Sequence, residues 1–326
     1  VCALYRRTDR LPDNRAGLFA DFVANLLNAE KKRLADIGLV WIGDEPIRVG
    51  MGQIAWAMGA QTEMERGEAE ALLRHHVPDH DPAKLLGGAA SAGIIDYGNS
   101  IRFTHQLLQQ YFAASVLGAL MDAQADPASI WPPDNWWAST GREETAILLA
   151  GDRNVPRGVA RWIAPAQPEF ALELLSQPDF ALDLTALDEQ TRAALVAGAR
   201  GKQADADPRG RAAAYRVLGA LRVDDRPGIG LRPDGLPDIA WCDVPDVPFL
   251  MGSDTVNDSL AQDDEMPQQT IRLGYSYRVS KYLITYAQYE AFVSEDGYTN
   301  RDYWTAAGWA WKGEKLHPEY GWHDPD

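Results

Sequence analysis

The segment from Val247 to Val293 changes its hydrophobic period twice, and this restricts how the segment can fold. An apolar run, Val247 to Met251, is closed by turn-forming residues 252–254, as expected of a strand that enters a turn. After an acidic loop, alternating positions predict strand pairing with one buried face: Thr270, Ile271, Leu273, Tyr275, Tyr277 and Val279. From Thr285, a plausible N-cap, the spacing becomes helical. The segment therefore predicts an α+β unit.

Several motifs of this region occur in a fixed order: Pro248–Ser253, Asp264–Pro267, Val279–Tyr289 with Phe292, Gly297–Tyr298, Tyr303–Trp304 and Trp309–Trp311. Together they resemble the start of the formylglycine-generating-enzyme (sulfatase-modifying factor) domain, whose fold is related to C-type lectins. The resemblance implies that residues 241–326 are the N-terminal half of such a domain. The paired cysteines with which these enzymes work belong to the second half, so no catalytic residue is expected in this chain.

The overall composition limits the class of protein. A chain of 326 residues is long enough for roughly two or three domains, and an apolar fraction of 46% supplies ample core. The net charge of −16, much of it after residue 234, argues against a nucleic-acid partner and against an anionic membrane surface.

Cysteine usage and hydropathy favour a cytoplasmic protein. Cys2 and Cys242 provide no disulfide framework, which fits a reducing compartment. No apolar run approaches the ~20 residues that a bilayer span needs, and residues 1–5 do not resemble a signal peptide. The chain starts without Met and stops within a motif, so we expect both ends to be cut from something longer.

Residues 1–122 have the pattern of a winged-helix region that follows helices. After a turn and cap at Leu11–Asn14, a one-sided apolar stripe predicts a helix over 15–35. A β-hairpin is predicted where 94–96 and 101–103 flank a turn, and Thr104 is predicted to cap the long helix that follows. Further helices are predicted at 54–58, 68–75 and 83–90.

Two stretches here, Leu11–Val23 and Ile101–Ala114, resemble the region after the ATPase domain in NACHT-type signal-transduction NTPases. In that family a histidine of an F-x-H motif contacts the β-phosphate of ADP, and the matching residue is His105. The predicted position agrees, because free N–H groups and the positive end of a helix dipole favour an anion. The alternative is that His105 is a boundary residue between strand and helix. The chain has no phosphate-loop motif, so ADP or ATP is expected only together with an upstream ATPase domain that this region would contact.

Residues 123–222 are predicted to form an irregular HEAT-like helical domain, and 223–240 a linker. The Trp-rich stretch 131–137 is predicted to tack the incoming chain onto a neighbouring surface. Helices are predicted at 143–149, 159–163, 170–175, 190–199 and 211–221, with prolines between them. The domain is either a spacer, which we favour, or a concave surface for a partner.

Other candidate sites have plainer alternatives. Trp304, Trp309 and Trp311 are candidate ligand-binding residues, although most aromatics near the end of such a domain fill its core. The acidic run 263–265 resembles a solvated loop more than a Ca²⁺ site. The imidazoles of His75, His76 and His80 are interrupted by proline and acids, so we predict no metal site there. Cys242 is predicted to be a packing residue.

Three functions remain open at this point. The first is the regulatory and ligand-recognition portion of a nucleotide-switched NTPase, ending in a lectin-like module that binds an unknown protein or small molecule. The resemblance allows such a module to be a variable protein of a diversity-generating retroelement. The second is an iron- or copper-dependent formylglycine-generating-type oxidase on a regulatory scaffold. The third is a transcription regulator that uses residues 1–122.

Overall fold

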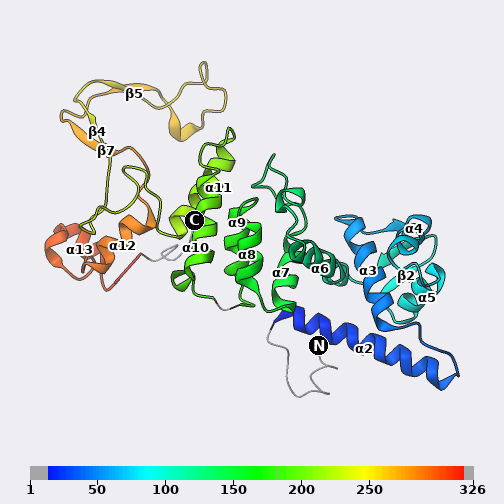
Figure 1. Cartoon of the computed structure of the whole chain (residues 1–326). Coiled ribbons are helices and arrows are strands. Elements are labelled where there is room, and N and C mark those ends of the chain that lie inside the picture. Colours follow the sequence, from blue (N-terminus) through cyan, green and yellow to red (C-terminus); the bar gives the residue numbers. More distant parts are fainter. Residues whose placement is uncertain (1–13, 181, 319–326) are drawn as a thin grey trace. The chain divides into compact units, whose positions relative to one another are not determined.

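The computed structural model describes residues 14–180 and 182–318. The chain divides into two compact units, residues 1–221 and 222–326 (Figure 1). The first unit is mainly helical with one small sheet, and the second combines short strands with short helices. Within the described parts, no helix is both long and apolar enough to cross a membrane.

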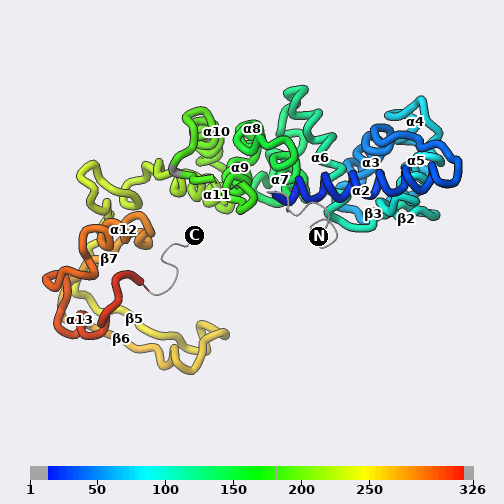
Figure 2. Tube along the Cα trace, turned by 90° about the horizontal axis from the view of Figure 1, so that it is seen from below, coloured from blue at the N-terminus to red at the C-terminus, as the bar shows by residue number. Residues whose placement is uncertain are grey.

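Helix α2 (Arg15–Asp36) confirms the first predicted helix, although residues 11–13 of the predicted turn lie outside the described residues. Asn14 caps it, since its side chain accepts the N–H of Gly17 at 2.8 Å. Val23 and Leu27 enter the main core of the first unit. The Asn14 side chain also donates to the carbonyl of Gly151, so α2 spans the unit from its helical array to its core (Figure 2).

The elements after α2 form a three-helix body with a small antiparallel sheet. In chain order they are α3 (Asp44–Met58), β1 (Met64–Glu65), α4 (Arg66–His76), α5 (Pro82–Ser91), β2 (Ile95–Tyr97) and β3 (Ser100–Phe103). The strand order is β1-β3-β2, with Met64 opposite Ile101 and Ile95 opposite Phe103. The β2–β3 pair confirms the predicted hairpin.

The second predicted helix was placed too short, because α3 begins at Asp44 rather than near Ile54. Pro46 lies in its first turn, where proline is tolerated. Gly50 and Gly52 weaken the helical pattern in the sequence, but both are buried against neighbouring helices. Tertiary packing therefore extends a helix that local propensity does not predict.

The predicted cap of the long helix was also wrong. Helix α6 (Gln106–Asp122) has His105 as its N-cap, with the His105 Nδ1 accepting the N–H of Leu107 at 3.3 Å. The Thr104 hydroxyl instead donates to the carbonyl of Gly93 at 2.9 Å. Because that bond ties Thr104 to the end of α5, the next residue takes the capping position.

Five helices of the first unit form an array that packs side by side (Figure 2). They are α7 (Glu143–Asp152), α8 (Pro156–Ile163), α9 (Pro168–Leu175), α10 (Glu189–Arg200) and α11 (Pro208–Ala220), with short 3₁₀ turns at Pro127–Ser129 and Leu184–Ala186. All five were predicted, and a proline opens α8, α9 and α11. The Trp-rich stretch is tacked down as predicted: Trp131 and Trp136 are buried, and the Trp136 indole N–H donates to Asp205 at 2.7 Å.

The second unit contains two short antiparallel ladders and two helices. Strand β4 (Trp241–Val244) pairs with β7 (Tyr277–Ser280), and β5 (Phe249–Met251) pairs with β6 (Gln269–Ile271). Helices α12 (Tyr286–Ser294) and α13 (Ala306–Lys312) follow, with 3₁₀ turns at Asp263–Glu265 and Arg301–Tyr303. Thr285 caps α12 as predicted, through a capping box with Gln288.

The segment Val223–Ala240, expected to be a linker, makes hydrogen bonds within the second unit. The buried Gln288 side chain donates to the carbonyls of Gly228 and Asp238, at 3.3 and 2.6 Å. The Thr285 hydroxyl donates to Ile229. These bonds fix the segment against the start of α12.

Candidate ligand-binding site

The two ladders of the second unit belong to one long hairpin that is interrupted in its middle. Val244 lies opposite Tyr277, and Phe249 lies opposite Ile271. The first side of the interruption therefore contains residues 245–248 and the second contains 272–276, one residue more. An extra residue on one strand is the defining property of a β-bulge, which bends a ladder and redirects side chains.

Asp246 holds this interruption together. Its carboxylate accepts the backbone N–H of Gly274 at 3.1 Å and the Nε–H of Arg272 at 3.2 Å, and its second oxygen lies 3.0 Å from Arg272 Nη2. Gly274 has φ +80°, a conformation that favours glycine. A side chain thus satisfies a backbone donor where strand pairing stops.

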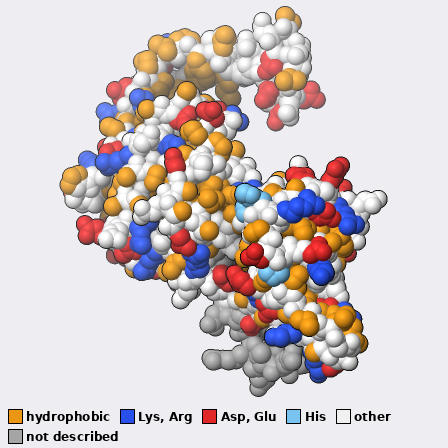
Figure 3. Space-filling model, turned by 45° about the vertical axis from the view of Figure 1, so that its right-hand side comes forward, with side chains coloured by type: hydrophobic (Ala, Val, Ile, Leu, Met, Phe, Trp, Pro, Cys, Tyr) orange, Lys and Arg blue, Asp and Glu red, His pale blue; other side chains and the backbone are white. Residues whose placement is uncertain are grey.

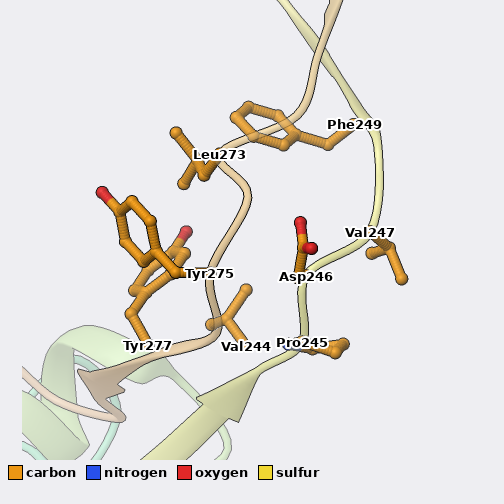
Figure 4. A pocket seen from close by; sticks show the side chains of 8 residues that line it. All are labelled: Val244, Pro245, Asp246, Val247, Phe249, Leu273, Tyr275 and Tyr277. Carbon is orange, nitrogen blue, oxygen red and sulfur yellow. The ribbon is translucent and has the colours of Figure 1, made fainter.

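A pocket of about 90 Å³ opens at the interruption (Figure 4). Leu273, Tyr275, Tyr277, Val244 and Phe249 line it, and the Asp246 carboxylate points between the two chain segments. The other lining residues are Pro245 and Val247. The volume is well below the ~300 Å³ at which sites for drug-sized molecules begin, so the pocket suits one side chain or a small chemical group.

The alternating residues of 270–279, some of which line the pocket, were predicted to have a buried face, and this prediction was wrong. Tyr275 is 61% exposed and Val279 is 46% exposed. The described part of the second unit places no layer over this side of the hairpin. Figure 3 shows apolar side chains along the arm that carries β5 and β6, with acidic side chains near its tip. An exposed apolar strip of this kind is typical of a binding surface.

The three candidate tryptophans lie in different surroundings. Trp304 is half-buried beside Phe292 and Tyr298, and its indole N–H donates to Gly297 at 2.6 Å. The Trp309 ring has the Lys312 ammonium 4.4 Å from its centroid. Trp311 is 70% exposed. The structure therefore does not gather these rings around one pocket.

An aromatic cluster on α12 fills the remaining core of the second unit. Tyr289 and Tyr298 share a hydrogen bond of 2.9 Å between their hydroxyls, beside Phe292. Burial, and then the hydrogen bond with Tyr298, raise the pKa of Tyr289 to about 12. Tyr289 is consequently a neutral packing residue rather than an acid or base.

His105 lies on the surface of the first unit, at the start of α6. Since its Nδ1 accepts the N–H of Leu107, the neutral ring carries its proton on Nε2. That N–H is a donor available to a ligand.

The described residues do not provide a metal centre. No group of three or more His, Cys, Asp or Glu side chains converges within 14–180 and 182–318. Cys242, predicted to pack, is exposed on β4 opposite Val279, because the hairpin face on which it lies is uncovered. The metal of a formylglycine-generating-type oxidase therefore has no fitting ligand set in the part of the chain that the structure describes.

The histidines and acids considered above have local roles. The rings of His75 and His76 meet edge to face at 4.7 Å, and burial followed by the neighbouring His75 lowers the pKa of His76. In the acidic run 263–265, the Glu265 carboxylate accepts the backbone N–H of Gln262 at 3.1 Å. Earlier in the same loop, Asp254 accepts the backbone N–H groups of Val256 and Asn257. The hydrogen bonds from Asn257 lower the pKa of Asp254.

Comparison with known proteins shows which family the second unit resembles. The sequence model of the Sulfatase-modifying factor enzyme 1-like domain matches residues 242–323. This match supports the domain that the motifs predicted. It covers the interrupted hairpin, its pocket and both helices.

Two hercynine oxygenases are among the similar proteins. The one from Mycolicibacterium thermoresistibile is 33% identical over 84 residues, which cover 25% of this chain and 19% of that protein. The one from Mycolicibacterium smegmatis is 30% identical over 105 residues, which cover 30% of this chain and 24% of that protein. The chain thus spans about a fifth to a quarter of the length of these relatives.

Proposed function

We propose that residues 242–318 are the first part of a formylglycine-generating-type module that recognises a ligand, carried on a regulatory scaffold formed by residues 14–221. The family match over 242–323 is the observation that carries this proposal. The open pocket supports recognition, because exposed aromatic rings around a single carboxylate offer both apolar contact and polar orientation. The proposed ligand is a small molecule or one side chain of a protein, met in the cytoplasm.

The test is binding of p-cresol, which has the size of one tyrosine side chain, to the full chain, measured by saturation-transfer NMR. Tyr275→Ala should lower the transfer signal several-fold, because it removes an exposed wall of the pocket. Leu260→Ala is the matched control, since Leu260 is 85% exposed but does not line the pocket. Equal losses in the two variants would show that the signal reports general exposure, and the proposed site would fail.

A second candidate function is an oxygenase, and the identity to the two hercynine oxygenases favours it. The assay is oxygen consumption by the complete natural protein with hercynine, iron(II) and dioxygen. Hercynine-dependent uptake would support this candidate, and its absence would leave ligand recognition. No step through a metal is assigned to this chain, because the described residues do not fit one.

For the scaffold we propose a winged-helix region and a HEAT-like array downstream of a NACHT-type ATPase domain. The element order α3-β1-α4-α5-β2-β3 supports the winged-helix region, and the packed helices α7–α11 support the HEAT-like array. In this proposal the Nε2–H of His105 donates to the β-phosphate of ADP and favours the resting state, which ligand binding and nucleotide exchange release.

The measurement is ADP affinity in the natural protein that includes the ATPase domain. His105→Ala should weaken ADP binding, whereas His75→Ala, a surface histidine on α4, should not. An unchanged affinity for His105→Ala, or a natural reading frame without an ATPase domain, would refute the nucleotide role. The proposal includes no nucleic-acid or membrane partner, and salt-dependent DNA binding in a gel shift would count against it.

A further inference from the structure

The first turn of α7 is held by two other elements of the first unit. Arg142, the N-cap residue, donates from Nη2 to the carbonyl of Trp56 near the end of α3, at 2.8 Å. Glu144, two residues later, accepts from Arg15 at the start of α2, at 2.9 Å. The helical array is therefore tied to α3 and α2 through this turn, in addition to the packing of α7 along α6 and α2.

Arg142 makes an unusual tie because it forms no ion pair with a carboxylate among the described residues. Its guanidinium carbon lies 4.0 Å from the centroid of the Trp56 indole, a cation–π arrangement. The carbonyl end of α3 carries the negative end of the helix dipole, which favours a cation. Burial lowers the pKa of Arg142, yet arginine stays charged in proteins.

Gln109 of α6 holds the loop that follows Trp56 and the end of α3. Gln109 is 5% exposed, and its side-chain amide donates to the carbonyls of Gly59 and Gln61, both at 3.0 Å. This loop connects α3 to β1 and contains Gly59 at φ +59°. The end of α3 is thus hydrogen-bonded both to α6, through Gln109, and to the start of α7, through Arg142.

We propose that the first turn of α7 is the coupling that makes the three-helix body and the array α7–α11 unfold together. Its two ties respond differently to ionic strength. The Arg15 tie consists of ion pairs with Glu144 and Asp179 whose side chains are 19–40% exposed, so salt screens it. The Arg142 tie depends on a carbonyl and an indole ring, so salt leaves it in place. The coupling holds in high salt through Arg142 and opens when that residue is removed. This inference concerns the scaffold and does not depend on the proposed function.

The experiment is differential scanning calorimetry of the full chain in about 1 M sodium chloride, where the Debye length is ~3 Å. The first unit of the wild type should unfold in one transition. In Arg142→Ala it should unfold in two, because the body and the array separate. A single transition in Arg142→Ala, at the wild-type temperature or below it, would overturn the proposal.

Two controls separate coupling from general destabilisation. Arg153→Ala removes the same charge from α7 and breaks an exposed pair with Asp122 of α6 at 2.7 Å, and it should leave one transition. Arg142→Lys keeps the charge but not the planar group, so it should resemble the alanine variant. A lysine variant with wild-type behaviour, or splitting in Arg153→Ala, would contradict the assigned role. If Arg142→Ala does not fold, Gln109→Met provides the same comparison by freeing the loop.

Discussion

At the residue scale, Glu30 is a nearly buried carboxylate, 4% exposed, on α2. Arg33 donates to both of its oxygens at 2.7 Å, and the Ser91 hydroxyl donates at 2.6 Å. The hydrogen bonds from Arg33 are the largest cause that lowers the pKa of Glu30. Because the folded-state pKa is lowered, this stabilisation is present above the unfolded value of ~4.3 and is lost as pH falls through the folded value.

Glu30→Gln should destabilise the first unit by about 1–3 kcal/mol at neutral pH, because it weakens charge-assisted hydrogen bonds to a buried group. The measurement is urea unfolding at several pH values, with the difference from wild type shrinking below about pH 4. Glu45→Gln is the control, since Glu45 is exposed. A penalty for Glu30→Gln that stayed constant down to pH 2 would contradict the pKa argument.

The contribution of Tyr289 to stability changes with pH in the opposite direction. Its pKa is raised to about 12, first by burial and then by Tyr298. Stability from the neutral phenol is present below the unfolded value of ~10 and is lost as pH rises toward 12. Ultraviolet titration should show a late ionisation step, because burial raises the pKa of both Tyr289 and Tyr111, and Tyr298→Phe should move the Tyr289 part of that step to lower pH. Complete ionisation of all tyrosines near pH 10 in the folded protein would refute this.

At the element scale, the interrupted hairpin depends on a side chain at the point where backbone pairing stops. The Asp246 carboxylate there accepts the N–H of Gly274. Asp246→Ala should destabilise the second unit by about 0.5–1.5 kcal/mol, the net value of a typical hydrogen bond, because the Gly274 N–H exchanges its carboxylate acceptor for water. Hydrogen exchange should show faster exchange at Gly274 and in β6. The matched control is Asp243→Ala, which breaks a pair with Arg278 at 3.0 Å whose carboxylate is 84% exposed. Equal effects of the two substitutions would remove the special role of Asp246.

The elements that were predicted well from the sequence have boundaries set by their own residues. Asn14, Thr285 and the prolines at helix starts mark boundaries that depend on nearby residues alone. The hairpin 95–103 is equally local. The start of α3 was missed because packing around Gly50 and Gly52 compensates for weak propensity.

The candidate site was harder to predict because it depends on what covers a surface. Alternation in 270–279 correctly indicated strands, but a period cannot say whether a second layer covers their apolar face. Asp246 gave one readable signal, an acid between Pro245 and Val247 opposite a glycine-containing turn. The surroundings of Trp304, Trp309 and Trp311 depend on tertiary contacts that spacing does not encode.

At the scale of the whole molecule, the two units have separate cores, one around α3–α6 and one around α12. A chain that ends at Arg222 should therefore keep the melting temperature of the first unit within about 2 °C, as expected for a domain that unfolds on its own. Calorimetry of this shortened chain beside the full chain is the measurement. The site of the cut leaves the hydrogen bond from Arg192 to the Leu221 carbonyl intact. A drop of 10 °C or more, well beyond the ~4–8 °C typical of 1 kcal/mol in a small domain, would show that the units depend on each other.

The contacts of Asp246 with Arg272 and Gly274 also bear on the order in which the second unit folds. Asp246 and Arg272 are separated by 26 positions, so closing the hairpin costs little chain entropy. Gln288, in contrast, must reach back 60 positions to Gly228. Nascent chains should consequently acquire the hairpin before the segment 223–240 docks, so the apolar strip is exposed from the earliest stage of folding onward.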